Sequence, residues 1–301
     1  MTIVREATSH APVTRPAAVR VRVWRFLRTW PLIPGLIVAM LVSFAIFAPL
    51  IAPRDPRQGN LFDRNIPPAW LEGGSSKYLF GTDPQGRDVF SRVVYGARIS
   101  LIVAAVVLST GAIAGTALGL IAGYSGGYWD EAIMRFVDIT FAVPFILVAL
   151  VVVIVMGQSF TIIVLLLVLF SWGGFSRQIR GETLLLKTRD YVALAKIAGA
   201  PSPYIMYKHI LPGVMNTLLV LASLRVGTLI LSEAILSYLG VGVPPPTPAW
   251  GAMVSEGRDY IGSAWWITFF PGLAIFLTVL GFNFLGDWLR DRFDPRLRQL
   301  G

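Results

Sequence analysis

Cysteine is absent from the 301-residue chain, charged residues make up only 14% of it, and histidine occurs twice. Without cysteine there can be no disulfide framework, no thiolate zinc or iron–sulfur site and no cysteine nucleophile. Soluble globular domains carry about 25% charged residues, whereas this chain is 55% hydrophobic. The composition therefore predicts a protein whose solvent is lipid.

Further absences restrict the chemistry. The net charge of +9 does not indicate nucleic-acid binding, because the basic residues lie between long apolar runs and not on one soluble face. The chain has no G-x-x-x-x-G-K-[ST] loop, so it does not hydrolyse ATP by that motif on its own. His10 and His209 lack the spacing of metal ligands. We therefore expect no catalytic residue, no metal site and no cofactor bound by this chain.

Long apolar runs predict six membrane-spanning helices, each needing ~20 residues to cross the hydrocarbon core. The 38-residue run 139–176 is too long for one crossing and has a polar break at 157–159, which indicates two helices. The other four spans are expected at 29–53, 99–129, 213–238 and 260–286. The expected fold class is all-α, a polytopic membrane protein.

The distribution of Lys and Arg predicts that both termini are cytoplasmic. In that orientation the cytoplasmic pieces hold seventeen basic residues and the outer segments eight. The cytoplasmic pieces are then 1–28, 124–138, 177–208 and 287–301, and the outer segments are 54–98 and 239–264. We expect a basic tail at 1–28, a membrane domain at 29–289 and a second tail at 290–301. The first span is interpreted as an uncleaved anchor, because its apolar run exceeds the ~7–15 residues of a signal peptide core.

Four glycines in the second span recur every four residues, at Gly111, Gly115, Gly119 and Gly123. This spacing places them on one stripe of the helix, where another helix can approach closely. The stripe predicts tight helix packing. A sliding surface between helices that rearrange is the functional alternative.

Two charged residues, Arg225 and Glu233, lie inside the fifth span. Charges in a membrane span face a cavity or a partner because burial in hydrocarbon is costly. Eight residues apart, they lie ~12 Å apart along the axis and ~80° around it, so a direct ion pair between them is not expected. Each residue therefore predicts either a polar lining of a substrate path or a buried contact with a neighbouring subunit.

The segment 177–212 predicts a helix–turn–helix before the fifth span. Apolar residues from 177 to 198 recur at helical spacing, which indicates one amphipathic helix with Gly199 as its C-cap. Ser202 and Pro203 predict the N-cap and first residue of a second short helix. Its small and apolar residues would form a surface on which another protein could pack. A loop that lies on the membrane surface is the alternative.

The charged cluster of Asp83, Arg87, Asp88 and Arg92 stands at the entry to the second span. Alternating charges at such a position typically form local ion pairs and helix caps. No nucleophile–base pair is evident in this cluster, so we do not interpret it as an active site.

Within 177–212, the run 191–200 is followed by 209–212, and Pro212 comes thirteen positions after Gly199. This pattern resembles the EAA loop of ABC importer permeases, on which the ATPase subunit docks in that family. The resemblance assigns this coupling role to Tyr191, Ala193, Ala195, Lys196, Gly199, Ala200, His209, Leu211 and Pro212.

One position departs from the family pattern. Ala193 stands where the loop usually has its glutamate, and Leu194 stands at the following alanine. The contact of that glutamate with the ATPase is therefore not carried over to this chain.

Further blocks narrow the resemblance to the C-type permease of dipeptide and oligopeptide importers. Residues between 233 and 251 resemble its fifth-span exit, and residues between 271 and 296 resemble its closing segment. Its extracytoplasmic signature is similar to Gly81, Thr82, Asp83, Gly86, Arg87 and Asp88. Only the N-terminal tail is not covered.

The resemblance implies a type I ABC importer transmembrane fold in the bacterial plasma (inner) membrane. The chain would form half of the translocation pathway for peptides or a related small solute. The implied partners are a B-type permease in a heterodimer, two ATP-binding subunits that carry ATP and Mg, and an extracytoplasmic solute-binding protein. A homodimer is the alternative. Related permeases also serve glutathione, nickel chelates, opines and sugars.

Two other classes of protein share some of these features. A secondary transporter or channel driven by an ion gradient has a similar composition, but its coupling carboxylates would lie mid-membrane, where only Arg225 and Glu233 are charged. A polytopic membrane enzyme would need a catalytic cluster near an interface, and the chain shows none.

Overall fold

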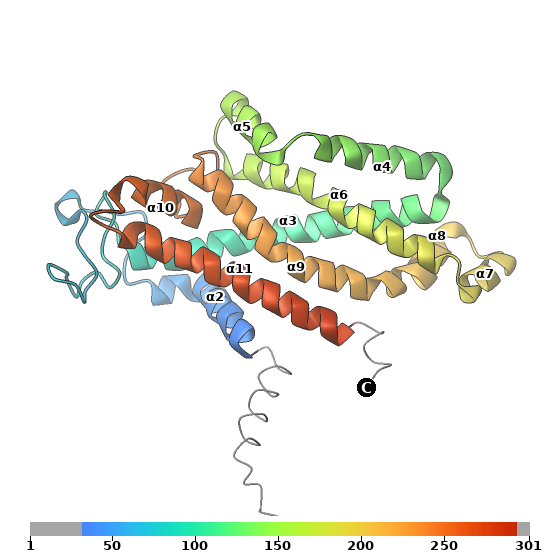
Figure 1. Ribbon diagram of the computed structural model, residues 1–301, viewed down its shortest axis with the longest axis horizontal. Coiled ribbons are helices and arrows are strands. Elements are labelled where there is room, and N and C mark those ends of the chain that lie inside the picture. Colours follow the sequence, from blue (N-terminus) through green and yellow to red (C-terminus); the bar gives the residue numbers. More distant parts are fainter. Residues whose placement is uncertain (1–31, 294–301) are drawn as a thin grey trace, which may run out of the picture. The chain divides into compact units, whose positions relative to one another are not determined.

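The computed structural model describes residues 32–293. This part of the chain is helical and contains no strand beyond an isolated bridge between Thr82 and Asp88. The tail 1–28, His10 and the end of the tail 290–301 lie outside the described residues. The helices are α2 (Leu32–Ile51), α3 (Val89–Ser125), α4 (Gly127–Ala142), α5 (Phe145–Met156), α6 (Phe160–Leu186), α7 (Asp190–Ile197), α8 (Ser202–Ile205), α9 (Leu211–Tyr238), α10 (Trp250–Gly257) and α11 (Trp266–Phe293) (Figure 1).

The prediction of an all-α polytopic membrane protein is confirmed. Five helical stretches are long and apolar enough to span a membrane, and the pair α4 and α5 makes a sixth if it counts as one span. The polar break at 157–159 lies between α5 and α6 as expected. The third span differs from a straight helix, because α4 and α5 meet at 76°. Pro144 explains this bend, since it holds Val143 in an extended conformation (φ −104°, ψ 130°) that ends α4.

α3 and α6 form the most extensive helix contact in the described chain, and Figure 1 shows them side by side. The four glycines of α3 lie along this contact. A Cβ atom on Gly115 would stand 2.5 Å from the Cβ of Phe175, and one on Gly119 would stand 2.7 Å from the carbonyl oxygen of Ser176. Any larger side chain on this stripe would push the two helices apart.

α9 packs against α11, α3 and α10. The indole of Trp250, at the start of α10, fits against Gly96 of α3 and donates a hydrogen bond to the carbonyl oxygen of Val93 at 2.9 Å. α7 and α8 lie near one end of α9, whereas α10 and the loops before α3 lie near the other end (Figure 1). The predicted coupling loop therefore lies near the start of α9, and the predicted signature residues before α3 lie near its end.

The prediction of one amphipathic helix over 177–198 is wrong. α6 continues to Leu186, and α7 starts at Asp190 after a short turn. Arg189 has extended backbone angles (φ −74°, ψ 146°), which end one helix and begin the next. The Nζ of Lys187 donates to the carbonyl oxygen of Gly123 at 2.7 Å and ties this turn to the end of α3.

The second short helix also differs in detail. Its N-cap is Pro201 and its first residue is Ser202, one position earlier than predicted. α8 continues through a π turn, Met206–Ile210, directly into α9. Pro212 explains the turn, because proline has no amide proton to donate and the backbone hydrogen bonds shift to i, i−5 spacing. The Leu211 amide accordingly bonds to the carbonyl oxygen of Met206.

Candidate functional site

The α7–α8 corner, residues 187–210, is anchored by a buried apolar cluster. Its buried members come from α3, α6, α7, α8, the π turn and α9, namely Leu120, Ile179, Val192, Ile205, Ile210 and Val214. Ala195, Ala200 and Leu211 pack partly buried against them. Because close-packed interiors transmit displacement rather than absorb it, a force on the corner reaches three long helices at once.

Gly199 ends α7 with a left-handed backbone conformation, φ +76°. The Gly199 amide donates to the carbonyl oxygen of Lys196 at 3.0 Å, and the Ala200 amide donates to that of Ala195 at 3.1 Å. This pair of bonds is a Schellman motif, in which glycine is favoured one position after the C-cap. The C-cap itself is Ala198, so the predicted cap was one residue late.

The corner presents apolar and small side chains to its surroundings. Leu194 is 65% exposed, Ile197 is 83% exposed and Tyr207 is 72% exposed. Ala193, Lys196 and Pro212 are exposed as well. Exposed large apolar residues gathered on one feature typically mark a contact surface.

Aromatic rings lie close together within the corner. The His209 ring lies half-buried between Tyr191 and Tyr204, at centroid distances of 6.3 Å and 5.8 Å. The Nζ of Lys196 stands 5.2 Å from the ring centroid of Tyr124, at the end of α3. Together with the residues described above, all nine residues of the predicted coupling loop lie on this corner or on its junction with α9.

Glu233 is fully buried in α9 and faces α3. Its Oε1 accepts from the Ser237 hydroxyl at 2.7 Å, and its Oε2 accepts from the Ser100 hydroxyl at 3.3 Å. A buried carboxyl group needs such partners. Glu233 thus joins α9 to α3 within this chain and does not line an open surface of it.

Arg225 is half-buried and lies beside α6. Its Cζ stands 5.0 Å from the ring centroid of Phe175, which is a cation–π contact. The guanidinium group also lies against the backbone of Gly174. Among the described residues no ion pair joins Arg225 to Glu233, so the structure separates the two charged residues of this span.

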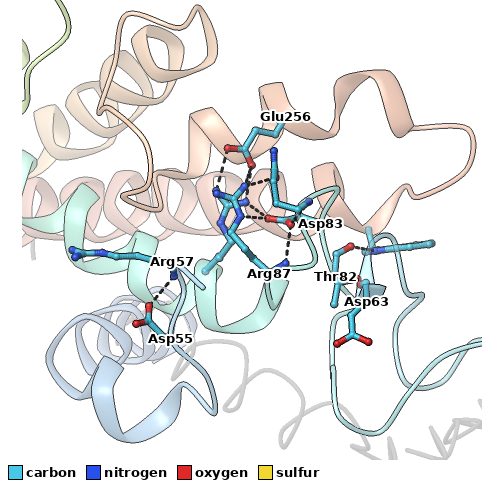
Figure 2. Close-up of polar contacts among 10 residues, drawn as sticks. Asp55, Arg57, Asp63, Thr82, Asp83, Arg87 and Glu256 are labelled. Atoms are coloured by element: carbon cyan, nitrogen blue, oxygen red, sulfur yellow. Dashed lines mark hydrogen bonds and ion pairs between the residues drawn. The ribbon is translucent and has the colours of Figure 1, made fainter. Parts of the chain in front are cut away.

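The predicted signature residues before α3 form a buried ion-pair cluster (Figure 2). Asp83 is fully buried and accepts from Arg87 Nε at 2.6 Å and from Arg92. Both guanidinium groups also reach Glu256 of α10, Arg87 at 2.8 Å and Arg92 at 2.6 Å. Two carboxylates and two guanidinium groups therefore join the loops before α3 to α10.

The remaining signature residues build the turn around this cluster. Asp88 is the N-cap of α3 and accepts from the Ser91 amide at 2.8 Å. Burial raises the pKa of the Asp88 carboxyl group, and the hydrogen bonds from Ser91 oppose that shift. Gly81 and Gly86 have positive φ angles of +78° and +72°, and Thr82 donates a hydrogen bond to the carbonyl oxygen of Asp63 at 2.5 Å.

Asp63 ties a loop of the same region to Tyr78 and Lys77. The Tyr78 hydroxyl donates to its Oδ2 at 2.8 Å and the Lys77 ammonium group donates to it at 3.2 Å. These two donors lower the pKa of Asp63 below its usual 3.8, the bond from Tyr78 being the larger cause.

Sequence reasoning missed Glu256. It lies 164 residues from Arg92 in the chain, and no local spacing connects them. The local cluster gave no signal for it, because the two arginines and two aspartates between residues 83 and 92 balance in charge. Among residues 32–293, no group of His, Asp and Glu is arranged to hold a metal ion.

Residues 115–299 match the family model described as binding-protein-dependent transport system inner membrane component. The chain is 43% identical over 292 residues to the glutathione transport system permease protein GsiD of Pectobacterium atrosepticum, covering 95% of each chain. It is 41% identical over 265 residues to the di/tripeptide transport system permease protein DppC of Pseudomonas aeruginosa, covering 88% of each. The same 43% identity extends over 300 residues of a GsiD protein of Escherichia coli.

Proposed function

The chain belongs to the family of binding-protein-dependent transport system inner membrane components, as a permease of the ABC importer type, and from this premise we propose that it forms half of a translocation pathway for peptides or glutathione. Relatives named for di/tripeptide and for glutathione transport are similarly close to it. Both substrates are short peptides with free carboxylates. A short peptide with a free carboxylate is therefore the substrate class that we assign.

The α7–α8 corner is our candidate for the surface on which the ATPase subunit docks. The observation that carries this proposal is the contrast between its two sides. Ile197 is 83% exposed, whereas Val192, five residues earlier on the same short helix, is fully buried in the cluster that joins α3, α6 and α9. A surface that is apolar outside and anchored inside can receive a partner and pass on its motion as a rigid body.

The complete importer in this proposal contains four further components. A B-type permease forms the other half of the pathway, two ATP-binding subunits bind ATP and Mg, and a solute-binding protein delivers substrate. Both termini and the α7–α8 corner face the cytoplasm. The ion-pair cluster and α10 face the opposite side, within the outer segments 54–98 and 239–264, where the solute-binding protein docks.

Co-purification tests the docking surface directly. We expect that Ile197→Asp abolishes recovery of the ATPase subunits with the two permeases, because a carboxylate would be buried in an apolar contact. The matched control is Phe62→Asp, which places the same charge on a side chain that is 96% exposed in the segment before α3. The control should retain the ATPases when the solute-binding protein is left out.

Transport in proteoliposomes tests the function as a whole. We expect uptake of a radiolabelled dipeptide that requires ATP and the solute-binding protein. The substitution Gly199→Asp should uncouple hydrolysis from uptake, because an added side chain strains the left-handed turn that ends α7. Uptake by the chain alone along an ion gradient would instead support a secondary transporter and refute the proposal.

A further inference from the structure

Arg225 holds a positive charge near the middle of a membrane-spanning helix without an anionic partner among the described residues. It stands about 20 Å from each end of α9 at 1.5 Å per residue. Its environment consists of burial, the Phe175 ring and the Gly174 backbone, and no carboxylate acts on it within residues 32–293. A charge at this depth is functional by default, because lipid does not solvate it.

The guanidinium group is held in place but keeps its hydrogen-bonding capacity. The guanidinium carbon stands 5.0 Å from the centroid of the Phe175 ring, and no side-chain N–H group of Arg225 donates a hydrogen bond to another residue among 32–293. A Cβ atom on Gly174 would stand 2.5 Å from Arg225 Cζ, so a larger residue there would displace the guanidinium group. The result is a planar fork of donors that matches the two oxygens of a carboxylate.

The same face of α9 carries further polar side chains. Thr228 is exposed and Ser232 is half-buried, and both lie within ~60° of Arg225 around the helix axis. Polar side chains within a membrane span preferentially face the bundle interior or a water-filled cavity. The exposed residues of α5, by contrast, are apolar over Val151, Ile154 and Val155.

We propose that Arg225 is the site in the translocation path that binds the carboxylate of the passing substrate, with Thr228 and Ser232 as the polar wall beside it. This inference rests on the proposed function and adds the group by which the path recognises its cargo. The Phe175 contact favours a transient ligand over a permanent one. The ring stabilises the guanidinium group while no substrate is bound. An arginine that is permanently paired with a carboxylate would not need this contact.

Single-cysteine labelling tests the proposal, because the natural chain contains no cysteine. The variant Thr228→Cys is assembled with its partner subunits in detergent, without nucleotide and without the solute-binding protein. Its labelling by an uncharged, water-soluble thiol reagent is measured with and without the dipeptide Ala-Ala or its C-terminal amide. Ala234→Cys is the matched control, because Ala234 is only 4% exposed on the other side of α9 and should stay unlabelled.

We expect Ala-Ala to slow the labelling of Thr228→Cys and the amide to leave it unchanged. Adding Arg225→Gln should raise the Ala-Ala concentration needed for protection by about 10- to 100-fold, which is the worth of a hydrogen bond to a charged group. Adding Arg225→Lys keeps the charge and should restore part of the protection. Leu221→Ala, one turn away and half-buried as Arg225 is, should leave it intact.

Equal protection by the acid and the amide would overturn the inference. Loss of assembly with the partner permease in Arg225→Gln, restored by Arg225→Lys, would also overturn it, since the carboxylate would then belong to the partner. ATP-driven uptake by the unmodified complex is measured first. If that uptake is present, a failed protection experiment removes only the role of Arg225, whereas absent uptake removes the proposed function itself.

Discussion

Replacing Asp83 by asparagine removes a negative charge from the buried ion-pair cluster without changing the size of the side chain. Oδ2 of Asp83 accepts from Arg87 and Arg92, whose side chains are only 8% and 2% exposed. Oδ1 accepts from the backbone amides of Gln85 and Arg87, both at 2.9 Å. An asparagine can satisfy either the two guanidinium groups or the two backbone amides, but not both. In either orientation its amide nitrogen, which is a donor, faces N–H groups that are also donors.

The expected cost follows from what remains in the cluster. Breaking a buried ion pair by removing one partner costs ~3–5 kcal/mol. Glu256 still accepts from Arg87 and Arg92 after the substitution and is itself partly exposed, at 25%. We therefore take the lower limit, ~3 kcal/mol, which corresponds to a roughly 100-fold increase in opening of the segment before α3.

Native-state hydrogen exchange measures this opening locally. Residues 54–88 and α10 of Asp83→Asn should exchange roughly 100-fold faster than in the unmodified permease pair, and the α7–α8 corner should be unaffected. The control is Asp55→Asn, at an exposed carboxylate that accepts from the Arg57 amide at 2.8 Å (Figure 2). If both variants exchange alike, the cluster does not hold this segment and the reasoning is refuted.

Two further predictions concern packing and pH. Gly115→Leu should destabilise the permease by about 1–3 kcal/mol through overpacking against Phe175, read as a lower melting temperature, whereas Gly35→Leu has open space and should not. The folded-state pKa of Asp63 is lowered, so its contribution to stability is present above pH 3.8 and is lost as the pH falls through the lower folded-state value. The hydrogen-exchange protection around Lys77 should therefore fall on acidification below about pH 4, and Asp63→Asn should lose that pH dependence. Unchanged acid sensitivity in the variant would contradict this assignment.

The spans could be predicted because hydropathy and length are local properties of the sequence. The polar break at 157–159 lies between α5 and α6 as expected. The bend between α4 and α5 was also signalled locally, by Pro144, but the apolar run around it hid the signal. Length of apolar sequence alone does not reveal where a span turns.

The end of α6 and the partner of the ion-pair cluster could not be predicted in this way. Helix propensity does not distinguish a continued α6 from a new helix at 177, because the choice depends on how Ile179 and Val192 reach one cluster. Glu256 meets Arg92 across 164 residues. Contacts of this kind depend on the whole fold, and a single sequence contains no local pattern that reports them.

The arrangement of rigid and unpartnered features indicates how the chain works. The glycine stripe joins α3 to α6, Glu233 joins α9 to α3, and the ion-pair cluster joins α10 to the start of α3. Force applied at the α7–α8 corner therefore moves these helices together. Within residues 32–293, Arg225 has no anionic partner and α5 leaves an apolar face exposed. In the proposed importer, a second permease that closes a polar path against α9 would account both for a charge that lipid does not solvate and for an apolar face that needs covering.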